Sequence, residues 1–217
     1  MIQSKTTIII FGRYPHAGKV KTRLAATIGD VNAANLYRVW TEHTFQQLTP
    51  LLSDCSVCFY CSDSDDLQLV HEWITPFGFT VSAQSGTSLG ERMKNAFYSE
   101  FQQEAERVII IGTDAPDTSS EILELSISAL DTADIVIGPA LDGGYYLLGM
   151  NSLHEDLFVD IPWSTDSVLQ STIEKAVSNK LSVHLLPVLR DIDTLEDLEA
   201  WRKTTSEVLY NSFFIAE

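Results

Sequence analysis

The chain has 217 residues, of which 45% are hydrophobic, and a formal net charge of −16 from 30 acidic and 14 basic side chains. This length suits one α/β core. A chain this acidic excludes nucleic acid as a bulk partner, because binding a phosphate backbone requires an extended basic surface. The sequence shows no signal-peptide pattern and no apolar run of membrane-spanning length, so we expect a cytoplasmic protein with no membrane partner.

Short apolar runs rich in β-branched residues alternate with amphipathic segments along the chain. Strands are expected near residues 7–11, 55–61, 79–83, 107–112, 134–138, 145–149 and 182–188. Helices are expected near residues 31–48, 65–75, 89–104, 119–130, 165–179 and 194–203. Thr118 with Glu121, and Thr194 with Asp197, have the spacing of helix caps. This alternation predicts one α/β domain, with a mostly parallel sheet, helices on both faces and right-handed crossovers.

The first expected strand is followed by a loop that concentrates positive charge. Residues 13–23 contain four basic side chains, and no acid precedes Asp30. In a parallel sheet, the loop that leaves the first strand lies at the crevice where ligands bind. Most charge runs are solvated surfaces, but this position in an acidic chain favours binding of a phosphate or diphosphate. The predicted phosphate-binding residues of this segment are Gly12, Arg13, Gly18, Lys19, Lys21, Thr22 and Arg23.

Two familiar phosphate-binding motifs do not fit this loop. A Walker A motif reads G-x-x-x-x-G-K-[ST], whereas five residues separate Gly12 from Gly18 and Val20 replaces the hydroxyl that would bind Mg²⁺. The G-x-G-x-x-G pattern of dinucleotide-binding proteins is missing from the same turn. By motif, the chain is neither a P-loop nucleoside triphosphatase nor a dinucleotide-binding protein.

The three cysteines of the chain form a C-x₂-C-x₂-C pattern at Cys55, Cys58 and Cys61. This spacing occurs in part of an iron–sulfur ligand run, but the chain has no fourth cysteine. On the expected strand, Cys55 and Cys61 point to one face and Cys58 to the other. The pattern therefore favours buried structural thiols over a metal site.

A polar segment with two glycines follows the third expected strand and leads into the helix near residues 89–104. Backbone donors at the start of a helix, together with an arginine, can bind a base or a phosphate. The nucleotide contacts predicted from this segment are Gln84, Gly86, Leu89 and Arg92.

Carboxylates follow two further strands, with Asp114 after the fourth and Asp191 and Asp193 after the last. A carboxylate beside phosphate-binding cations is favourable when a divalent ion lies between it and the phosphates, and Mg²⁺ is commonly held in this way. Helix capping is the alternative for Asp114 and Asp117, and it suits Asp117 better because Asp114 lies too far upstream. We predict that Asp114, Asp193 and Asp191 bind Mg²⁺ or Mn²⁺.

Residues 137–146 have the pattern of a strand, a turn and an aromatic strand. The dipeptide Asp142-Gly143 indicates a hairpin. Gly143 and Gly144 also permit a ligand to approach the backbone closely, and Asp142 is a possible acceptor-binding or catalytic base, so both interpretations stand together. Trp163 and Ser164 are candidates for an acceptor or sugar wall, although a core tryptophan followed by a helix cap is the default interpretation.

Six short segments carry a resemblance to a known fold: Pro15-x-x-Gly18-Lys19-x-Lys21-Thr22-Arg23-Leu24, Gln84-x-Gly86-x-x-Leu89-Gly90-x-Arg92-Met93, Gly112-Thr113-Asp114-x-Pro116, Asp142-Gly143-Gly144-Tyr145-Tyr146, Pro162-Trp163-Ser164-Thr165 and Asp191-Ile192-Asp193-Thr194. In this order they resemble the nucleotide-diphospho-sugar transferase fold of the glycosyltransferase-A type. They resemble in particular a bacterial family of provisionally named glycosyltransferases, sometimes linked by name to arsenosugar biosynthesis. The resemblance covers nearly the whole chain.

The resemblance implies a Rossmann-like, three-layer α/β/α domain over residues 1–217. Its nucleotide-binding half would comprise about residues 1–115 and its acceptor-binding half about residues 116–217. A divalent metal would bridge the diphosphate, with Asp114 matching the metal-binding aspartate after the fourth strand and Asp193 a carboxylate of related sugar-nucleotide enzymes. Asp-Ala-Pro replaces the D-x-D triplet at residues 114–116.

Three functions follow from these observations. The first is metal-dependent transfer of a sugar from a nucleotide-diphospho-sugar to a small acceptor, with Asp142 as base and Lys21 and Arg23 stabilising the leaving group. The basic loop also resembles that of 2-phospholactate guanylyltransferase and other nucleotidyltransferases, which implies nucleotide transfer with release of pyrophosphate. The third is a non-catalytic nucleotide-sugar-binding protein. Convergent carboxylates argue against it, because they repel one another without a metal or substrate.

Overall fold

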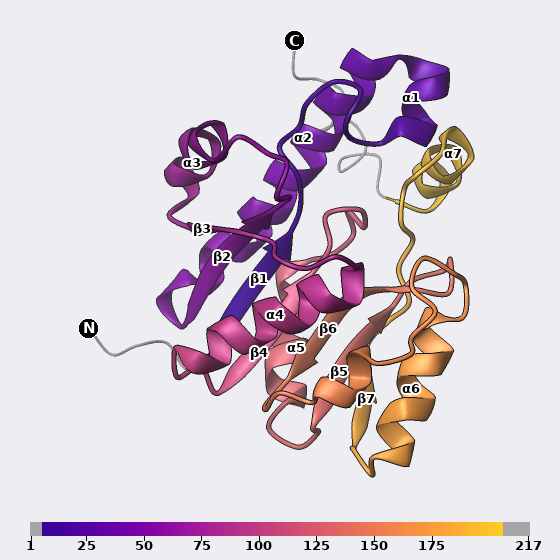
Figure 1. Cartoon of the computed structure of the whole chain (residues 1–217). Helices are drawn as coiled ribbons and strands as arrows, with labels where there is room; N and C mark the ends of the chain where they lie inside the picture. The colour runs from indigo at the N-terminus through magenta and orange to yellow at the C-terminus, as the bar shows by residue number, and fades with distance from the viewer. Residues whose placement is uncertain (1–5, 206–217) are drawn as a thin grey trace.

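The computed structural model describes residues 6–205, so the ends of the predicted domain, 1–5 and 206–217, lie outside the described residues. The strands are β1 (Thr6–Phe11), β2 (Cys55–Cys61), β3 (Thr80–Ala83), β4 (Arg107–Ile111), β5 (Ile135–Pro139), β6 (Tyr145–Met150) and β7 (Val183–Leu185). They form one sheet in the order β3-β2-β1-β4-β6-β5-β7 (Figure 1). Every neighbouring pair is parallel except those of β6, which runs antiparallel to β4 and β5. The predicted α/β sheet is confirmed.

The helices that connect these strands are α1 (Thr22–Ile28), α2 (Asp30–Leu48), α3 (Leu67–Ile74), α4 (Leu89–Gln102), α5 (Ser120–Ala129), α6 (Val168–Ser178) and α7 (Leu195–Thr204). Short 3₁₀ turns occupy Thr49–Ser53, Thr75–Phe77 and Glu155–Phe158. None of the helices within residues 6–205 has both the length and the apolar composition needed to cross a bilayer.

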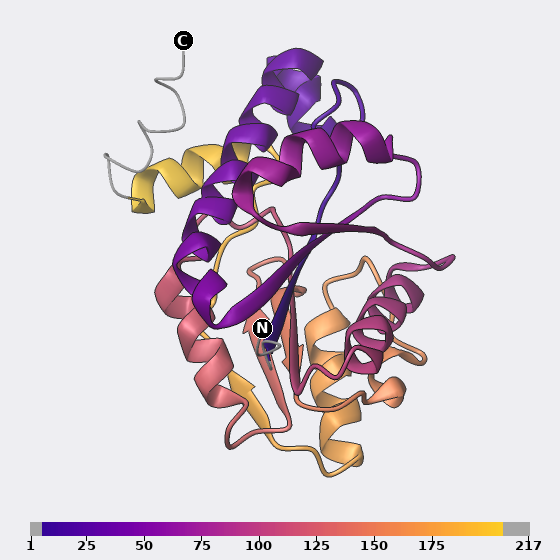
Figure 2. The same cartoon turned by 90° about the vertical axis from the view of Figure 1, so that its left-hand side faces the viewer.

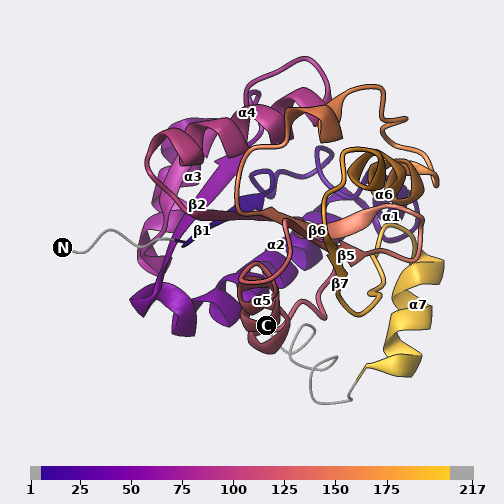
Figure 3. The same ribbon diagram turned by 90° about the horizontal axis from the view of Figure 1, so that it is seen from below.

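Alternating side chains along the central strands build a core on each face of the sheet. Ile8 and Ile10 of β1 pack with the buried residues of α2, α3 and α5, whereas Ile9 packs with those of α4 and α6. Figure 3 shows this layering, with α4 and α6 on one side of the sheet and α2 and α5 on the other. The three-layer α/β/α architecture follows directly from the period-two burial of these strands.

Helices α1 and α7 add a smaller core at one end of the molecule. Leu24 of α1, Trp40 of α2 and Trp201 of α7 are fully buried in it. The rings of Trp40 and Trp201 meet edge to face, with 6.4 Å between their centroids. Figure 2 shows the yellow α7 beside the indigo N-terminal helices. This small core brings the basic loop and the segment before α7 together, although they lie far apart in the sequence.

Local signals at two helix starts, those of α7 and α5, differ in how well they predicted the structure. The Thr194–Asp197 capping box is confirmed. The predicted Thr118 cap is wrong, because Ser119 caps α5 and the Thr118 hydroxyl instead donates to the Ala115 carbonyl oxygen. Asp117 does not cap this helix either, since its carboxylate accepts a hydrogen bond of 2.9 Å from the Trp201 indole N–H.

The three cysteines are unpaired thiols, as predicted, and they lie on opposite faces of β2. Cys55 and Cys61 belong to the core under α2 and α3, whereas Cys58 belongs to the core under α4. Burial, with a smaller effect of Asp54, raises the pKa of the Cys55 thiol to about 11. Burial, with a smaller effect of Asp65, raises the pKa of Cys61 to about 11 as well. The folded protein therefore favours the protonated thiols.

We expect these thiols to make stability depend on pH in the alkaline range. A raised pKa in the folded state contributes stability that is complete below the ordinary value of 9.0 and is lost as the pH rises through about 11. The free energy of unfolding, measured by denaturant titration between pH 8 and 11, should fall less steeply in the double variant Cys55→Ala, Cys61→Ala. An identical slope in the two proteins would show that other groups cause the decline.

Candidate functional site

A cavity of about 600 Å³ opens at the carboxyl ends of β1 and β4, between the basic loop and the start of α4. Such crevices are where parallel α/β sheets bind ligands. We call it the cationic cavity because five basic and two acidic side chains line it: Arg13, Lys19, Lys21, Arg23, Arg92, Asp114 and Asp193. The chain as a whole has a net charge of −16, whereas the side chains that line this cavity carry more positive than negative charge.

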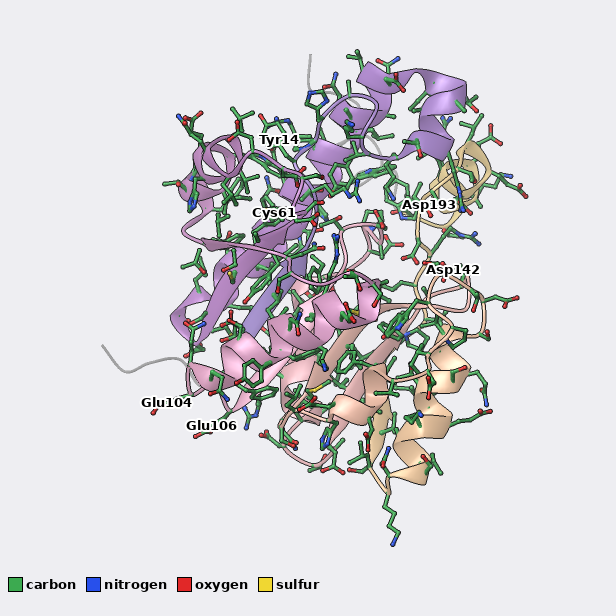
Figure 4. All side chains as sticks on the ribbon, viewed as in Figure 1. Tyr14, Cys61, Glu104, Glu106, Asp142 and Asp193 are labelled. Atoms are coloured by element: carbon green, nitrogen blue, oxygen red, sulfur yellow. The ribbon has the colours of Figure 1, made fainter. Side chains whose placement is uncertain are left out.

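The structure gathers most of the predicted site residues around this cavity. Those that line it are Gly12, Arg13, Lys19, Lys21, Thr22, Arg23, Gln84, Leu89, Arg92, Asp114 and Asp193. Those that do not are Gly18, Gly86, Asp142, Gly143, Gly144, Trp163, Ser164 and Asp191. Figure 4 shows that Asp142 and Asp193 nevertheless lie at the same end of the molecule, with Glu104 and Glu106 at the opposite end.

Lys21 is a buried cation that joins three separate protein oxygens. Its Nζ lies 2.5 Å from Asp114 Oδ1 and 3.0 Å from Asp193 Oδ1, and it donates to the Ile192 carbonyl oxygen at 2.6 Å. Burial alone would lower the pKa of Lys21, but Asp114 and Asp193 outweigh this effect and raise it. The ammonium was expected to face a bound phosphate, and in the structure it lines the cavity while contacting these three protein oxygens.

The backbone of Lys21 explains how one lysine of the loop points inward. Lys21 has φ 46° and ψ 44°, a left-handed conformation immediately before α1. For a residue other than glycine this conformation costs about 1–2 kcal/mol, so surrounding contacts must hold it. Lys19 and Arg23, on either side of this bend, are exposed. Arg23 Nη1 remains 3.9 Å from Asp193 Oδ2, and its side chain is 77% exposed.

Tyr37 of α2 is a site residue that the sequence reasoning missed. Its hydroxyl accepts a hydrogen bond from the Arg13 backbone N–H at 3.0 Å and shares another with the Thr113 hydroxyl at 3.1 Å. Burial raises the pKa of this phenol, and Asp114 adds to the effect. Tyr37 thus links the start of the basic loop to the turn after β4. Its only sequence signal is a phenol on the apolar face of a helix, which is common in ordinary cores.

Gln84 and Arg92 are both held by the protein, which fixes the wall of the cationic cavity opposite the basic loop. The Gln84 amide nitrogen donates to the Tyr60 carbonyl oxygen at 2.9 Å and lies 3.4 Å from that of Gly12. Arg92 donates to the Gly86 carbonyl oxygen at 3.1 Å and to Asp63 at 3.1 Å. Gly86, at φ 135°, has a backbone conformation that other residues rarely adopt, which explains the glycine here.

Asp191 lies two residues before Asp193 and does not line the cationic cavity. Burial, followed by the charges of Asp114 and Asp142, raises the pKa of Asp191 to about 7. The backbone N–H of Ile192 donates to the Asp114 carbonyl oxygen at 2.9 Å, which ties the two acidic segments together. Within residues 6–205, no three acidic, histidine or cysteine side chains form a preassembled metal site. The structure therefore pairs Asp114 with Asp193, and it does not bring Asp191 into a three-ligand set with them.

The predicted hairpin between β5 and β6 is confirmed, and its glycine serves the fold. Gly143 has φ 89°, and a Cβ atom there would overlap the Asp166 carbonyl oxygen of the loop before α6. The close backbone approach at Gly143 is therefore made by the chain itself. Asp142 is exposed, and its Oδ1 accepts a hydrogen bond of 2.8 Å from the Gly144 N–H.

Trp163 packs between α4 and β6 and does not line the cationic cavity. Its ring stacks on Phe158 with a centroid distance of 6.5 Å, and it meets Tyr145 edge to face. Gly90 of α4 lies against the indole so closely that a Cβ atom there would overlap it. This is the default core packing considered above, although the expected cap after Trp163 is not formed, because α6 starts after Ser167, which makes no side-chain cap. Ser164 is exposed.

Comparison with known proteins places the chain in a bacterial family. The model of a family described as an uncharacterized protein conserved in bacteria (DUF2064) matches residues 48–165. A crystal structure from Desulfovibrio desulfuricans G20, named a "putative nucleotide-diphospho-sugar transferase", shares 36% sequence identity, with a TM-score of 0.89 over 98% of this chain and 95% of that one. The chain belongs to the DUF2064 family. No protein with curated annotation matches its sequence.

More distant structures share the fold of this DUF2064 protein. The inositol-1-phosphate CTP transferase from T. maritima is 16% identical, with a TM-score of 0.57 over 97% of this chain and 95% of that one. The Rv0371C complex with manganese from Mycobacterium tuberculosis H37Rv is 14% identical, with a TM-score of 0.55 over 91% of this chain and 97% of that one. At these identities the likeness shows the fold alone. The predicted fold of the nucleotide-diphospho-sugar transferase type is confirmed.

Proposed function

We propose that this DUF2064 protein is a metal-dependent glycosyltransferase that binds a nucleotide-diphospho-sugar in the cationic cavity and transfers the sugar to a small acceptor. The observation that carries the proposal is the reversal of charge at the carboxyl ends of β1 and β4. Five basic side chains on this wall suit a substrate with several negative charges, and a phosphate chain is the simplest such group. The name of the relative from Desulfovibrio desulfuricans supports the same class of substrate.

The exposed cations of the loop are the groups proposed to bind the phosphates. Arg13 and Lys19 are exposed and form no ion pair within residues 6–205, and Arg23 makes only a long contact with Asp193. These three side chains can reorient onto a departing nucleoside diphosphate and stabilise its charge. Gln84 and the first residues of α4 form the facing wall, where the nucleoside would lie. This division assigns the nucleotide to the half of the domain before about residue 115.

The donor set at the floor of the cavity fits a divalent ion of the Mg²⁺ or Mn²⁺ type. Asp114 and Asp193 present carboxylate oxygens, and their side chains are 49% and 45% exposed. Hard cations of this kind are commonly held by one or two carboxylates together with substrate phosphates, so a closed protein cage is not required. Such an ion, held by Asp114 and Asp193, would supply positive charge to the phosphate oxygens.

The acceptor is proposed to enter from the side of the β5–β6 hairpin. The Leu141 N–H of this hairpin donates to the Leu189 carbonyl oxygen at 3.0 Å, so the hairpin lies beside the segment that leads to Asp191 and Asp193. Asp142 Oδ2 is the proposed base for an acceptor hydroxyl, in the half of the domain after about residue 116. Gly143 and Gly144 form the turn that carries Asp142. Trp163 and Ser164 belong to the same proposed acceptor-binding half, but they do not line the cavity.

The alternative function is nucleotidyl transfer from a nucleoside triphosphate to a small hydroxylated or phosphorylated acceptor, with release of pyrophosphate. Two observations support this alternative. A triphosphate carries more charge than a diphosphate, and the cavity presents five cations. The fold is also shared with a protein named as a CTP transferase. The same cations would then stabilise pyrophosphate.

A titration of ligands with MnCl₂ present separates these functions. We expect isothermal titration calorimetry to detect tighter binding of a nucleoside diphosphate or nucleotide-diphospho-sugar than of the matching triphosphate. Product analysis with an acceptor panel should then show release of the nucleoside diphosphate. Preference for triphosphate with pyrophosphate release would favour the alternative. Binding of donors without any turnover would indicate a sensor, and no binding of any nucleotide would overturn the proposal.

A further inference from the structure

The carboxylates proposed to bind a divalent ion already share a cation that the protein supplies. Lys21 Nζ contacts one oxygen of Asp114, one oxygen of Asp193 and the carbonyl oxygen of Ile192, all within 3.0 Å. Only 3% of the Lys21 side chain is exposed, so water does little to screen this charge. An ammonium therefore lies among the oxygens that suit a small divalent cation.

We propose that Lys21 is an internal counter-ion that keeps this oxygen cluster from binding a divalent ion until nucleotide phosphates are present, so that ion and nucleotide bind together. The inference rests on the proposed function, which supplies the phosphates. It assigns Lys21 a positioning role that differs from the direct phosphate contact expected from the sequence.

The charges of the cluster give the physical reason. Asp114 and Asp193 carry two negative charges, and the ammonium of Lys21 cancels one of them. A divalent ion close to the same oxygens is repelled by the ammonium at short range in a poorly screened setting. Nucleotide phosphates change this balance, because they add negative charge and offer the ammonium another partner. Binding of either ligand alone is therefore weaker than binding of both together.

The neighbouring lysine of the same loop provides a matched control. Lys19 lies two residues before Lys21 and lines the same cavity, but it is exposed and forms no ion pair within residues 6–205. Removing the charge of Lys19 lowers the positive charge of the loop by one unit and leaves the three contacts of Lys21 in place. A difference between the two substitutions therefore reports on the position of Lys21 and not on the net charge of the protein.

The test is a titration of the whole protein with MnCl₂, with free Mn²⁺ followed by electron paramagnetic resonance and without added nucleotide. For Lys21→Met we expect an affinity for Mn²⁺ at least about tenfold higher than that of the wild type, because a buried unit charge a few ångströms from the ion has been removed. Lys19→Met should bind Mn²⁺ as weakly as the wild type. Adding a nucleoside diphosphate should raise the affinity of the wild type for Mn²⁺ and should do so much less in Lys21→Met.

A second substitution guards against misfolding at a strained position. Lys21→Gly removes the same charge and suits the left-handed backbone, so thermal unfolding and circular dichroism can establish that at least one neutral variant is folded. A folded neutral variant that binds Mn²⁺ no better than the wild type would overturn the inference. Tight binding of Mn²⁺ by the wild-type protein in the absence of nucleotide would overturn the inference as well.

The titration without nucleotide is independent of the proposed activity. If the neutral variants gain Mn²⁺ affinity but no nucleotide binds to any form, the role of Lys21 as an internal counter-ion stands and the proposed function fails. If nucleotides bind and turn over but Mn²⁺ affinity is the same in all variants, the proposed function stands and the role of Lys21 fails.

Discussion

Replacing Asp114 with alanine should lower turnover by about 10³-fold at saturating nucleotide and metal, the order expected when a major source of charge stabilisation is removed from a reacting phosphate. Asp114 lies at the end of β4, is half exposed to the cationic cavity and is tied to Asp193 through Lys21. Its loss removes one of two carboxylates available to a divalent ion. Steady-state assays with the preferred donor, at increasing Mn²⁺, measure the effect.

The position three residues later supplies the control. Asp117 is also a carboxylate after β4, but it accepts a hydrogen bond from Trp201 and does not line the cavity. We expect Asp117→Asn to retain turnover within about twofold, with at most a loss of about 1 kcal/mol in the free energy of unfolding. Full turnover of Asp114→Ala at saturating ligands would remove Asp114 from the mechanism, as would an equal loss of turnover in both variants.

The largest effect on stability is expected at Phe45 of α2, which is fully buried. Its ring lies against Phe59, Trp73, Phe77 and Phe79, with centroid distances between 4.8 and 5.8 Å. Phe45→Ala leaves a cavity at the centre of this aromatic cluster, and such truncations cost about 3–5 kcal/mol. Guanidinium titration should therefore show a markedly lower midpoint for the variant.

An exposed aromatic side chain on the opposite layer tests whether burial causes this loss. Tyr98 of α4 is 53% exposed, so Tyr98→Ala should change the free energy of unfolding by less than about 0.5 kcal/mol. Phe45→Leu, which retains most of the apolar volume, should lie between the two. Equal losses at Phe45 and Tyr98 would show that the cluster around Phe45 does not dominate stability.

The strands could be predicted to within a few residues because each is a short, almost continuously apolar run. β2 spans the predicted residues 55–61, and β4 differs from its prediction by one residue. β7 is shorter than predicted, since only Val183–Leu185 forms the strand. Helix α1 was missed, because its seven residues bury only Leu24 and Ala25 and present no long apolar stripe. Amphipathic periodicity needs more turns than α1 contains.

The location of the cavity could be predicted from the sequence, but the pairing of charges within it could not. The position of each loop after a strand of a mostly parallel sheet places Arg13, Asp114 and Asp193 at one edge of that sheet. Nothing local, however, distinguishes Lys21, which is buried, from Lys19, which is exposed. The difference depends on a left-handed backbone at Lys21 and on carboxylates that arrive from distant segments. Long-range contacts of this kind leave no periodic trace in the sequence.

The contact between Lys21 and the Ile192 carbonyl oxygen joins residues separated by 171 positions. A growing polypeptide therefore exposes its basic loop long before the segment that completes the floor of the cavity exists. Until residue 193 has been added and α7 has docked, Lys21 lacks two of its three oxygen partners. A nascent chain should therefore complete the set of contacts around Lys21 late, after most of the cavity wall has been synthesised. The burial of Lys21 against Ile192 and Asp193 would then report that the last helix of the described fold has docked.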